Sequence, residues 1–176
     1  MPPLSASDTT PHFAVIVMGV SGCGKSTLGS LLGTALDAPF LEGDDFHAPE
    51  AVAKMRAGQA LTDDDRWPWL DRIGVAANAA ITDRGRTVIA CSALRAAYRA
   101  RLRAAMAAPV RFILLENSRE RLLARLAARA DHYMPTSLLD SQLATLERPD
   151  EDEGAMILTT DADPCALRDA ALRWLR

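Results

Sequence analysis

Short, continuous apolar runs alternate along the chain with segments in which apolar residues recur at helical spacing. Runs of this kind, bounded by glycine, proline or acidic residues, are typical of strands that are covered on both faces. The five runs lie at residues 13–18, 40–41, 87–91, 110–116 and 155–160. Because strands alternate with helices, the pattern predicts an α/β fold, with a five-stranded parallel sheet and helices on both faces.

Proline, glycine and capping residues set the expected helix boundaries. Pro49 and Pro68 each suit a first helical position, and Ser118 is a suitable N-cap for a later helix that carries Arg125 and Arg129. The other expected helices span residues 28–37, 94–106, 137–146 and 164–176. A break at residues 131–135 separates two helices of a segment, about residues 125–147, that we expect to form a mobile helical lid.

The length of 176 residues fits one domain, which we place at residues 12–176. Residues 1–11 have neither a positive region nor an apolar core like those of a signal peptide, so we expect a disordered lead-in. The longest apolar run, at residues 13–20, has eight residues, whereas a membrane span needs roughly 20. We therefore expect no membrane partner and a cytoplasmic location.

Composition narrows the classes of partner further. The net charge is −3, which is the wrong sign for a protein dedicated to binding nucleic acid. Three cysteines, Cys23, Cys91 and Cys165, form an odd set without metal-ligand spacing. We expect free thiols, with neither a disulfide framework nor a zinc site.

The segment GVSGCGKS at residues 19–26 matches the phosphate-loop pattern G-x-x-x-x-G-K-[ST] in full. It follows the first predicted strand and opens a predicted helix, as the mechanism of the motif requires. Lys25 is one of only two lysines among twenty basic residues, so a chance lysine here is improbable. We expect backbone N–H groups and Lys25 to bind the phosphates of ATP, and the Ser26 hydroxyl to hold Mg²⁺.

The segment EGDDFH at residues 42–47 lies at the end of the second predicted strand, at the edge where open α/β sheets bind ligands. A carboxylate there could accept the proton of a substrate hydroxyl. The third strand ends in Cys91 and Ser92 without an aspartate, so Asp44 is also our first choice for the carboxylate near Mg²⁺. The alternative is ordinary turn chemistry at Asp44 and Asp45, with His47 as a surface residue.

Three further groups of charged residues have a functional and a structural interpretation. Asp65 either caps a helix or belongs to the site. Arg95 and Arg99 form either an anion-binding rim or part of a solvated helix face. Arg125 and Arg129, one turn apart, either bracket a triphosphate in a closing lid or lie on a charged outer face.

Five segments carry a resemblance to a known family: GVSGCGKST, GDDFH, KMRAGQALTDDDRWPWL, VIACSALRAAYRARLR and HYMPTSLLDSQLATLERP. With them, the chain from about Val15 to Asp163 resembles the gluconokinases, small P-loop kinases related to shikimate and adenylate kinases. The resemblance implies a P-loop kinase fold and transfer of phosphate from ATP to the terminal hydroxyl of D-gluconate, which gives 6-phospho-D-gluconate. It also implies Mg²⁺ as cofactor and a homodimer.

The resemblance also implies roles for individual residues. Lys25, Asp44 and Arg129 would be catalytic, with Ser26 and Asp44 near the metal. Arg125 would cover the adenine and phosphates, and Asp163 and Pro164 would form the turn beside the adenine. The expected phosphate-loop contacts are Gly19, Val20, Ser21, Gly22, Cys23, Gly24, Lys25, Ser26 and Thr27. The expected sugar-acid contacts are Asp44, His47, Arg56, Asp65, Arg95, Arg99 and His132.

Gluconate is a carboxylate at neutral pH, so an arginine at the sugar end of the cleft would distinguish it from glucose. We consider Arg95 first, because it follows the third strand directly, and Arg56 and Arg99 next. Two alternative functions remain at this point. A shikimate kinase would be expected to have a Gly-Gly turn after the third strand, where this chain has CSAL. A nucleotide-dependent switch would bind ATP without phosphorylating a metabolite.

Overall fold

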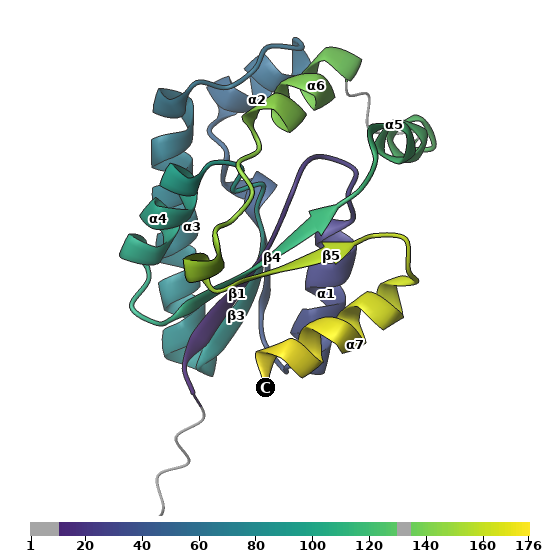
Figure 1. Ribbon diagram of the computed structural model, residues 1–176. Helices are drawn as coiled ribbons and strands as arrows, with labels where there is room; N and C mark the ends of the chain where they lie inside the picture. Colours follow the sequence, from purple (N-terminus) through teal and green to yellow (C-terminus); the bar gives the residue numbers. More distant parts are fainter. Residues whose placement is uncertain (1–10, 130–134) are drawn as a thin grey trace, which may run out of the picture.

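The computed structural model describes residues 11–129 and 135–176. Nearly all of the predicted lead-in and the middle of the predicted lid, with His132, lie outside these ranges. Five parallel strands form one sheet in the order β2-β3-β1-β4-β5 (Figure 1). The strands are β1 (Phe13–Met18), β2 (Phe40–Glu42), β3 (Arg86–Ala90), β4 (Val110–Glu116) and β5 (Ala155–Thr159). The predicted five-stranded parallel sheet is confirmed.

The helices cover both faces of the sheet, as predicted. They are α1 (Lys25–Ala35), α2 (Pro49–Arg56), α3 (Asp63–Arg84), α4 (Ala96–Ala105), α5 (Arg119–Ala127), α6 (Thr136–Thr145) and α7 (Pro164–Leu175), with short 3₁₀ turns η1 (Gly43–Phe46) and η2 (Glu151–Glu153). Helices α3 and α4 lie on one face, and α1 and α7 on the other (Figure 1). In the described part of the chain, no helix combines the length and apolar character needed to cross a membrane.

The central strand β1 is buried on both faces because its side chains alternate between two apolar cores. Ile16 and Met18 belong to the core beneath α3 and α4, together with Trp69 and Phe112. Val15 and Val17 belong to the core beneath α1 and α7. This alternation explains why the run is continuously apolar in the sequence and why a single amphipathic face is not visible there.

Helix α3 begins at Asp63, five residues before the predicted start at Pro68. The Thr62 side chain accepts a hydrogen bond from the Asp65 backbone N–H, and the Asp65 carboxylate accepts one from the Thr62 N–H. This reciprocal capping box fixes the true start of the helix. Pro68 lies inside the helix with an exposed side chain, so its suitability for a first position was misleading.

Candidate active site

The phosphate loop connects β1 to α1, and its shape depends on glycine. Gly19, Gly22 and Gly24 have φ values of 140°, 82° and 99°, a region that other residues rarely adopt. A Cβ at Gly19 would also lie 2.8 Å from the Leu115 carbonyl oxygen. Gly24 is the N-cap of α1 and provides no side-chain cap. The first-turn N–H groups of α1 are therefore available to an anion, and the helix dipole favours one.

Ser26 meets a carboxylate that the sequence interpretation did not assign. Its hydroxyl donates a hydrogen bond to Glu42, the last residue of β2. The Asp44 side chain, by contrast, is 73% exposed and lies 3.8 Å from the His47 Nε2 atom. Glu42, and not Asp44, is thus the carboxylate at Ser26. The signal was present in EGDDFH, because Glu42 ends the strand that runs beside β3 into the same sheet edge.

The pair of Ser26 and Glu42 fits a hard cation. Both offer oxygen, the ligand type that Mg²⁺ takes, and both lie beside the loop that would hold the phosphates. Within residues 11–129 and 135–176, no group of three or more His, Cys, Asp or Glu side chains could hold a metal by itself. A cation here would therefore depend on phosphate oxygens and water for its remaining ligands, as Mg²⁺ does in kinases.

The turn that carries Asp44 is fixed by hydrogen bonds from helix α3. Trp69 Nε1 donates to the Gly43 carbonyl at 2.7 Å, and Arg72 Nε donates to the Phe46 carbonyl at 2.7 Å. Gly43 itself packs so closely that a Cβ would lie 2.3 Å from the Ala90 carbonyl oxygen. Asp44 is therefore an exposed carboxylate on an anchored backbone at the ligand-binding edge of the sheet.

His47 contributes to this anchoring. Its ring stacks on Trp69, with ring centroids 4.2 Å apart, and its side chain is only 4% exposed. Burial lowers the pKa of His47, with Arg72 and Arg66 acting in the same direction and Asp44 opposing them. We infer that His47 is mainly neutral at pH 7 and supports the turn. A direct contact with the sugar acid remains a prediction.

Arg95 lies in a polar cluster at the start of α4. The Tyr98 hydroxyl donates to Asp63, Arg66 donates to the Tyr98 oxygen at 3.1 Å, and Arg95 lies 3.5 Å from Asp63. The Arg95 side chain is still 43% exposed, so it can reach a ligand. Asp63 and Arg66 belong to the acidic segment DDDR at residues 63–66, of which only Asp65 was assigned a role from the sequence. Arg56 is exposed at the end of α2.

Two predicted sugar-acid contacts have structural partners instead. Both Asp65 carboxylate oxygens lie 2.9 Å from Lys54 Nζ, and with the Thr62 bonds this contact lowers the pKa of Asp65 to about 2. Asp65 therefore serves the helix start and one ion pair, and its contact with the sugar acid remains a prediction.

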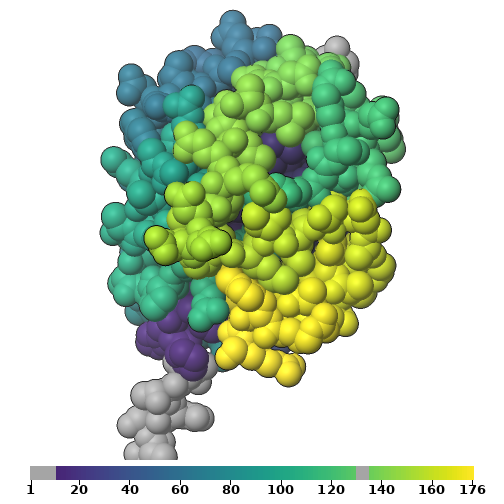
Figure 2. All heavy atoms as spheres, viewed as in Figure 1, coloured from purple at the N-terminus to yellow at the C-terminus, as the bar shows by residue number. Residues whose placement is uncertain are grey.

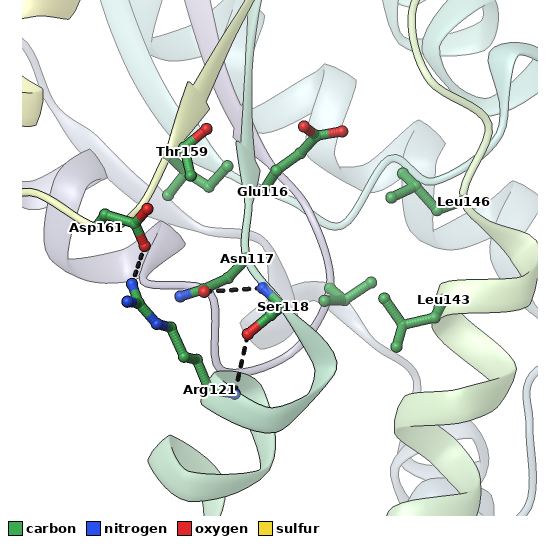
Figure 3. A pocket seen from close by; sticks show the side chains of 10 residues that line it. Glu116, Asn117, Ser118, Arg121, Leu143, Leu146, Thr159 and Asp161 are labelled. Atoms are coloured by element: carbon green, nitrogen blue, oxygen red, sulfur yellow. Dashed lines mark hydrogen bonds and ion pairs between the residues drawn. The ribbon is translucent and has the colours of Figure 1, made fainter.

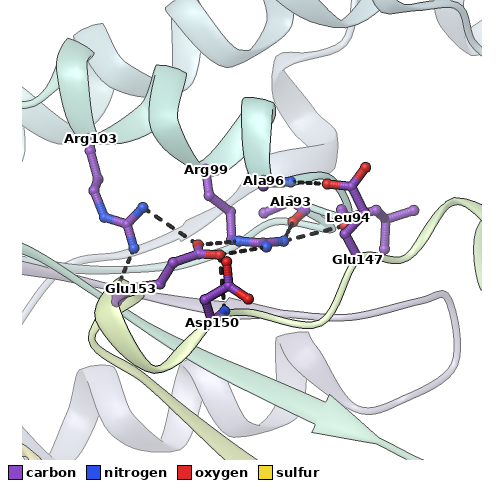
Figure 4. Close-up of polar contacts among 8 residues, drawn as sticks. All are labelled: Ala93, Leu94, Ala96, Arg99, Arg103, Glu147, Asp150 and Glu153. Carbon is purple, nitrogen blue, oxygen red and sulfur yellow. Dashed lines mark hydrogen bonds and ion pairs between the residues drawn. The ribbon is translucent and has the colours of Figure 1, made fainter.

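Arg99 is buried away from any ligand. Its side chain is fully buried and donates to Glu153 at 2.7 and 2.9 Å and to the Ala93 carbonyl at 3.1 Å (Figure 4). These contacts occupy its guanidinium group, so Arg99 is not available to an anion in the cleft. Sequence alone could not distinguish it from Arg95, four residues earlier at the N-cap of the same helix.

Helix α5 of the predicted lid contacts the phosphate loop through Arg125. Its guanidinium donates to the Cys23 carbonyl at 3.3 Å and to the Thr160 carbonyl at 3.1 Å. Arg129 is exposed, two residues after the end of α5. Asp163 caps α7 and accepts from the Cys165 N–H at 3.0 Å. Roles for Arg125, Arg129 and the Asp163-Pro164 turn around a nucleotide remain predictions.

A hollow of about 590 Å³ lies between α5, α6 and the ends of β4 and β5. Figure 2 shows it between the two green helices, with atoms of the purple N-terminal part inside. Polar side chains line one side and leucines the other (Figure 3). Val20 is the only phosphate-loop residue in its lining, which contains neither Lys25 nor Ser26. Cys23 and Cys91 are buried and Cys165 is exposed, and none of the three is paired in the structure.

The fold and the phosphate loop together define a P-loop kinase. Residues 15–149 match the AAA domain family. A gluconokinase from Gluconobacter oxydans is 41% identical over 163 residues, which cover 93% of this chain and 90% of that protein. A gluconokinase structure from Sinorhizobium meliloti is 40% identical with a TM-score of 0.83 and covers 93% of this chain and 91% of that one. The chain belongs to the gluconokinase family.

The structure of an unliganded sugar kinase from Janibacter is also similar to this chain over almost its whole length. It is 43% identical with a TM-score of 0.86, and the match covers 94% of this chain and 95% of that one. The similarity therefore extends over the sheet, the phosphate loop and the segments on the acceptor side, and not over the phosphate loop alone.

Proposed function

We propose that this protein transfers the γ-phosphate of ATP to the terminal hydroxyl of D-gluconate and releases 6-phospho-D-gluconate and ADP. The observation that carries the proposal is the meeting of the phosphate loop with the carboxylate turn after β2, through the bond from Ser26 to Glu42. This contact brings a phosphate-binding backbone and the exposed Asp44 to one edge of the sheet. Membership of the gluconokinase family is the reason for proposing D-gluconate as the phosphate acceptor.

Phosphoryl transfer needs positioning and charge neutralisation more than covalent work by the protein. The loop N–H groups and Lys25 would bind the β- and γ-phosphates, and Arg129 would approach them from the lid. Ser26 and Glu42 would hold Mg²⁺, which supplies charge neutralisation at the phosphate oxygens when it is bound. Arg125 would cover the nucleotide beside Asp163 and Pro164.

Asp44 would act on the acceptor. The terminal hydroxyl oxygen of gluconate forms the new bond to the γ-phosphorus while the bond from that phosphorus to the bridging oxygen of ADP breaks. The hydroxyl proton passes to the Asp44 carboxylate. An exposed carboxylate on an anchored turn suits this role, because the backbone can hold it in place while the side chain still reaches a ligand.

Arg95 is our candidate for the gluconate carboxylate, since it is accessible at the start of α4, and Arg56 is the second candidate. A charge-assisted pair with either would disfavour glucose, which has no carboxylate. The burial of Arg99 reduces the three original candidates to these two.

A coupled ATP assay on a panel of acceptors tests the function. The panel contains gluconate, shikimate, glucose, glycerate and nucleoside monophosphates. We expect gluconate to have the highest kcat/KM and ADP release to depend on its addition. A clear preference for shikimate would reject the assignment, and ADP release without any acceptor would support a nucleotide-dependent switch instead.

The variant Asp44→Asn tests the proposed base. It keeps the shape of the side chain and removes its charge, so kcat should fall by about 10²-fold or more with little change in the affinity for ATP. Asp45→Asn, at the neighbouring exposed position, is the matched control and should stay within a few-fold of wild type. The opposite ranking of the two variants would move the role to Asp45.

The family resemblance also leads us to propose a homodimer and a cytoplasmic location. Light scattering coupled to size-exclusion chromatography measures the first directly, and a monomer at micromolar concentration would contradict it. Microscopy of the tagged protein in its own cells tests the second.

A further inference from the structure

Helix α6 is attached to the phosphate loop by one directional contact. The Ser21 backbone N–H donates a hydrogen bond to Gln142 Oε1 at 2.8 Å. Around it the contact is apolar: Leu139 is fully buried in the same core as Val20 and Cys23 of the loop. Apolar packing alone would allow a helix to shift along its neighbour, whereas a hydrogen bond fixes its position.

The chain just beyond the C-terminal end of α6 is attached to the acceptor side. Glu147, two residues after the helix, donates its backbone N–H to the Leu94 carbonyl at 2.8 Å. Its carboxylate accepts from the Ala96 N–H at 2.7 Å (Figure 4). Helix α4 has no side-chain cap from its own N-cap residue, Arg95, so the Glu147 carboxylate takes that place and interacts favourably with the helix dipole. These contacts flank Arg95 on both sides.

Two more contacts complete the connection. The Gly19 N–H at the start of the phosphate loop donates to the Ser92 carbonyl at 3.2 Å. Beyond Glu147, the ion pair of Glu153 with the buried Arg99 fixes the segment that leads to β5. The phosphate loop, the segment 92–96, the segment that begins at Glu147 and α6 thus form a closed ring of contacts.

We propose that Gln142 is a positioning residue that couples the nucleotide site to the gluconate site. Its amide oxygen holds the phosphate loop to the last turn of α6, while Glu147, five residues further along the chain, holds the Arg95 segment. Ordering of either site by its ligand would then order the other site through α6. The inference rests on the proposed function, and Gln142 itself touches no reacting atom in it.

The amide chemistry of Gln142 supports this role over a general packing role. An amide oxygen accepts the Ser21 N–H without bringing negative charge to a loop that must bind phosphate. A carboxylate at the same place would make the same hydrogen bond but would repel ATP. The two variants Gln142→Met and Gln142→Glu therefore separate the hydrogen bond from the charge.

The test measures coupling between two ligands by calorimetry. The dissociation constant of gluconate is determined with and without a saturating non-hydrolysable ATP analogue and Mg²⁺. In wild type we expect the analogue to tighten gluconate binding by about fivefold or more, the lower end of typical coupling. In Gln142→Met this factor should fall to within about twofold of one, with kcat reduced by about tenfold.

The variant Asp140→Asn is the matched control. It lies on the same helix and breaks the pair of Asp140 with Arg119, whose side chains are both about half exposed and make no contact with the Gln142 amide. Coupling should remain as in wild type. Gln142→Glu should weaken binding of the ATP analogue by about fivefold or more through charge repulsion, with gluconate affinity unchanged in the absence of nucleotide.

Glu147→Ala provides a second approach if Gln142→Met fails to fold, because it breaks the same connection at the other end and should also abolish coupling. Wild-type coupling in Gln142→Met, or the absence of coupling in wild type, would overturn the inference. Failure of the proposed function is distinct: it would appear as a wild-type enzyme that does not phosphorylate gluconate at all.

Discussion

The nucleotide side of the site is formed mainly by backbone groups, whereas the acceptor side is formed mainly by side chains. On the nucleotide side, three left-handed glycines and the uncapped start of α1 make a site out of backbone N–H groups. On the acceptor side, the η1 turn and the start of α4 are held by side chains of α3, which lies far away in the sequence. A site made of backbone groups is determined by a short stretch of sequence. A site made of side chains depends on which charged residues pair with distant residues in the folded protein.

The largest effect should come from the nucleotide side. Lys25→Ala should reduce kcat by about 10³-fold, because it removes a charge that stabilises the transition state. The thermal midpoint should change little, since among the described residues the Lys25 ammonium makes one short contact, to the Val20 carbonyl. Lys54→Ala, at the only other lysine, is the control and should retain activity within a few-fold. Lys54 pairs with Asp65. An equal loss of kcat in Lys54→Ala would therefore show that this ion pair takes part in catalysis and does not only support the start of α3.

The second effect concerns stability on the acceptor side. Glu153→Ala leaves the fully buried Arg99 without its partner, so the free energy of unfolding should fall by about 3 to 5 kcal/mol. Asp71→Asn, which breaks the half-exposed pair with Arg101, should leave the urea midpoint almost unchanged. Chemical denaturation of both variants provides the comparison. Similar midpoints for the two would show that Arg99 finds other partners or water.

Arg95→Met tests whether the accessible Arg95, in contrast to the buried Arg99, binds the substrate carboxylate. If Arg95 pairs with the gluconate carboxylate, kcat/KM for gluconate should fall by about thirtyfold, mainly through KM. The value for glucose should change little, so the ratio of the two shrinks. Arg101→Met on the same helix is the control. An unchanged ratio in Arg95→Met would move carboxylate recognition to Arg56.

The smallest effect is a pH dependence that originates at His47. Its folded-state pKa is lowered by burial, so the unfolded chain binds a proton first as the pH falls. Stability should therefore decrease as the pH falls from about 6.5 towards the lowered pKa, and this contribution should be constant below it. His47→Phe keeps a ring on Trp69 but cannot titrate. Urea midpoints at pH 7.5 and 5 should differ less in this variant than in wild type.

Much of the sheet could be predicted from the sequence because each strand is a local apolar run between breaking residues. The strand at Val110–Glu116 was predicted to the residue. The start of α3 was misplaced because a proline outweighed the capping pair of Thr62 and Asp65, although both residues were visible. Competition between two local signals, and not a lack of signal, caused that error.

The acceptor site was less predictable, for a physical reason. The chain has eighteen arginines, and pattern alone gives Arg95 and Arg99 the same character. Only the position of Glu153, more than fifty residues later, makes one of them structural. Glu42 was missed in a similar way: its role depends on how close the first turn of α1 comes to the end of β2, which no sequence spacing reports.

The place of β1 in the middle of the sheet has a consequence during synthesis. This strand leaves the ribosome first, yet its neighbours begin only at Arg86 and Val110. At about 5 to 20 residues per second, β1 must wait several seconds before either partner exists. During that time the most apolar segment of the chain has unpaired backbone groups on both sides, so the nascent protein should depend on chaperones more than a fold with local strand pairs would.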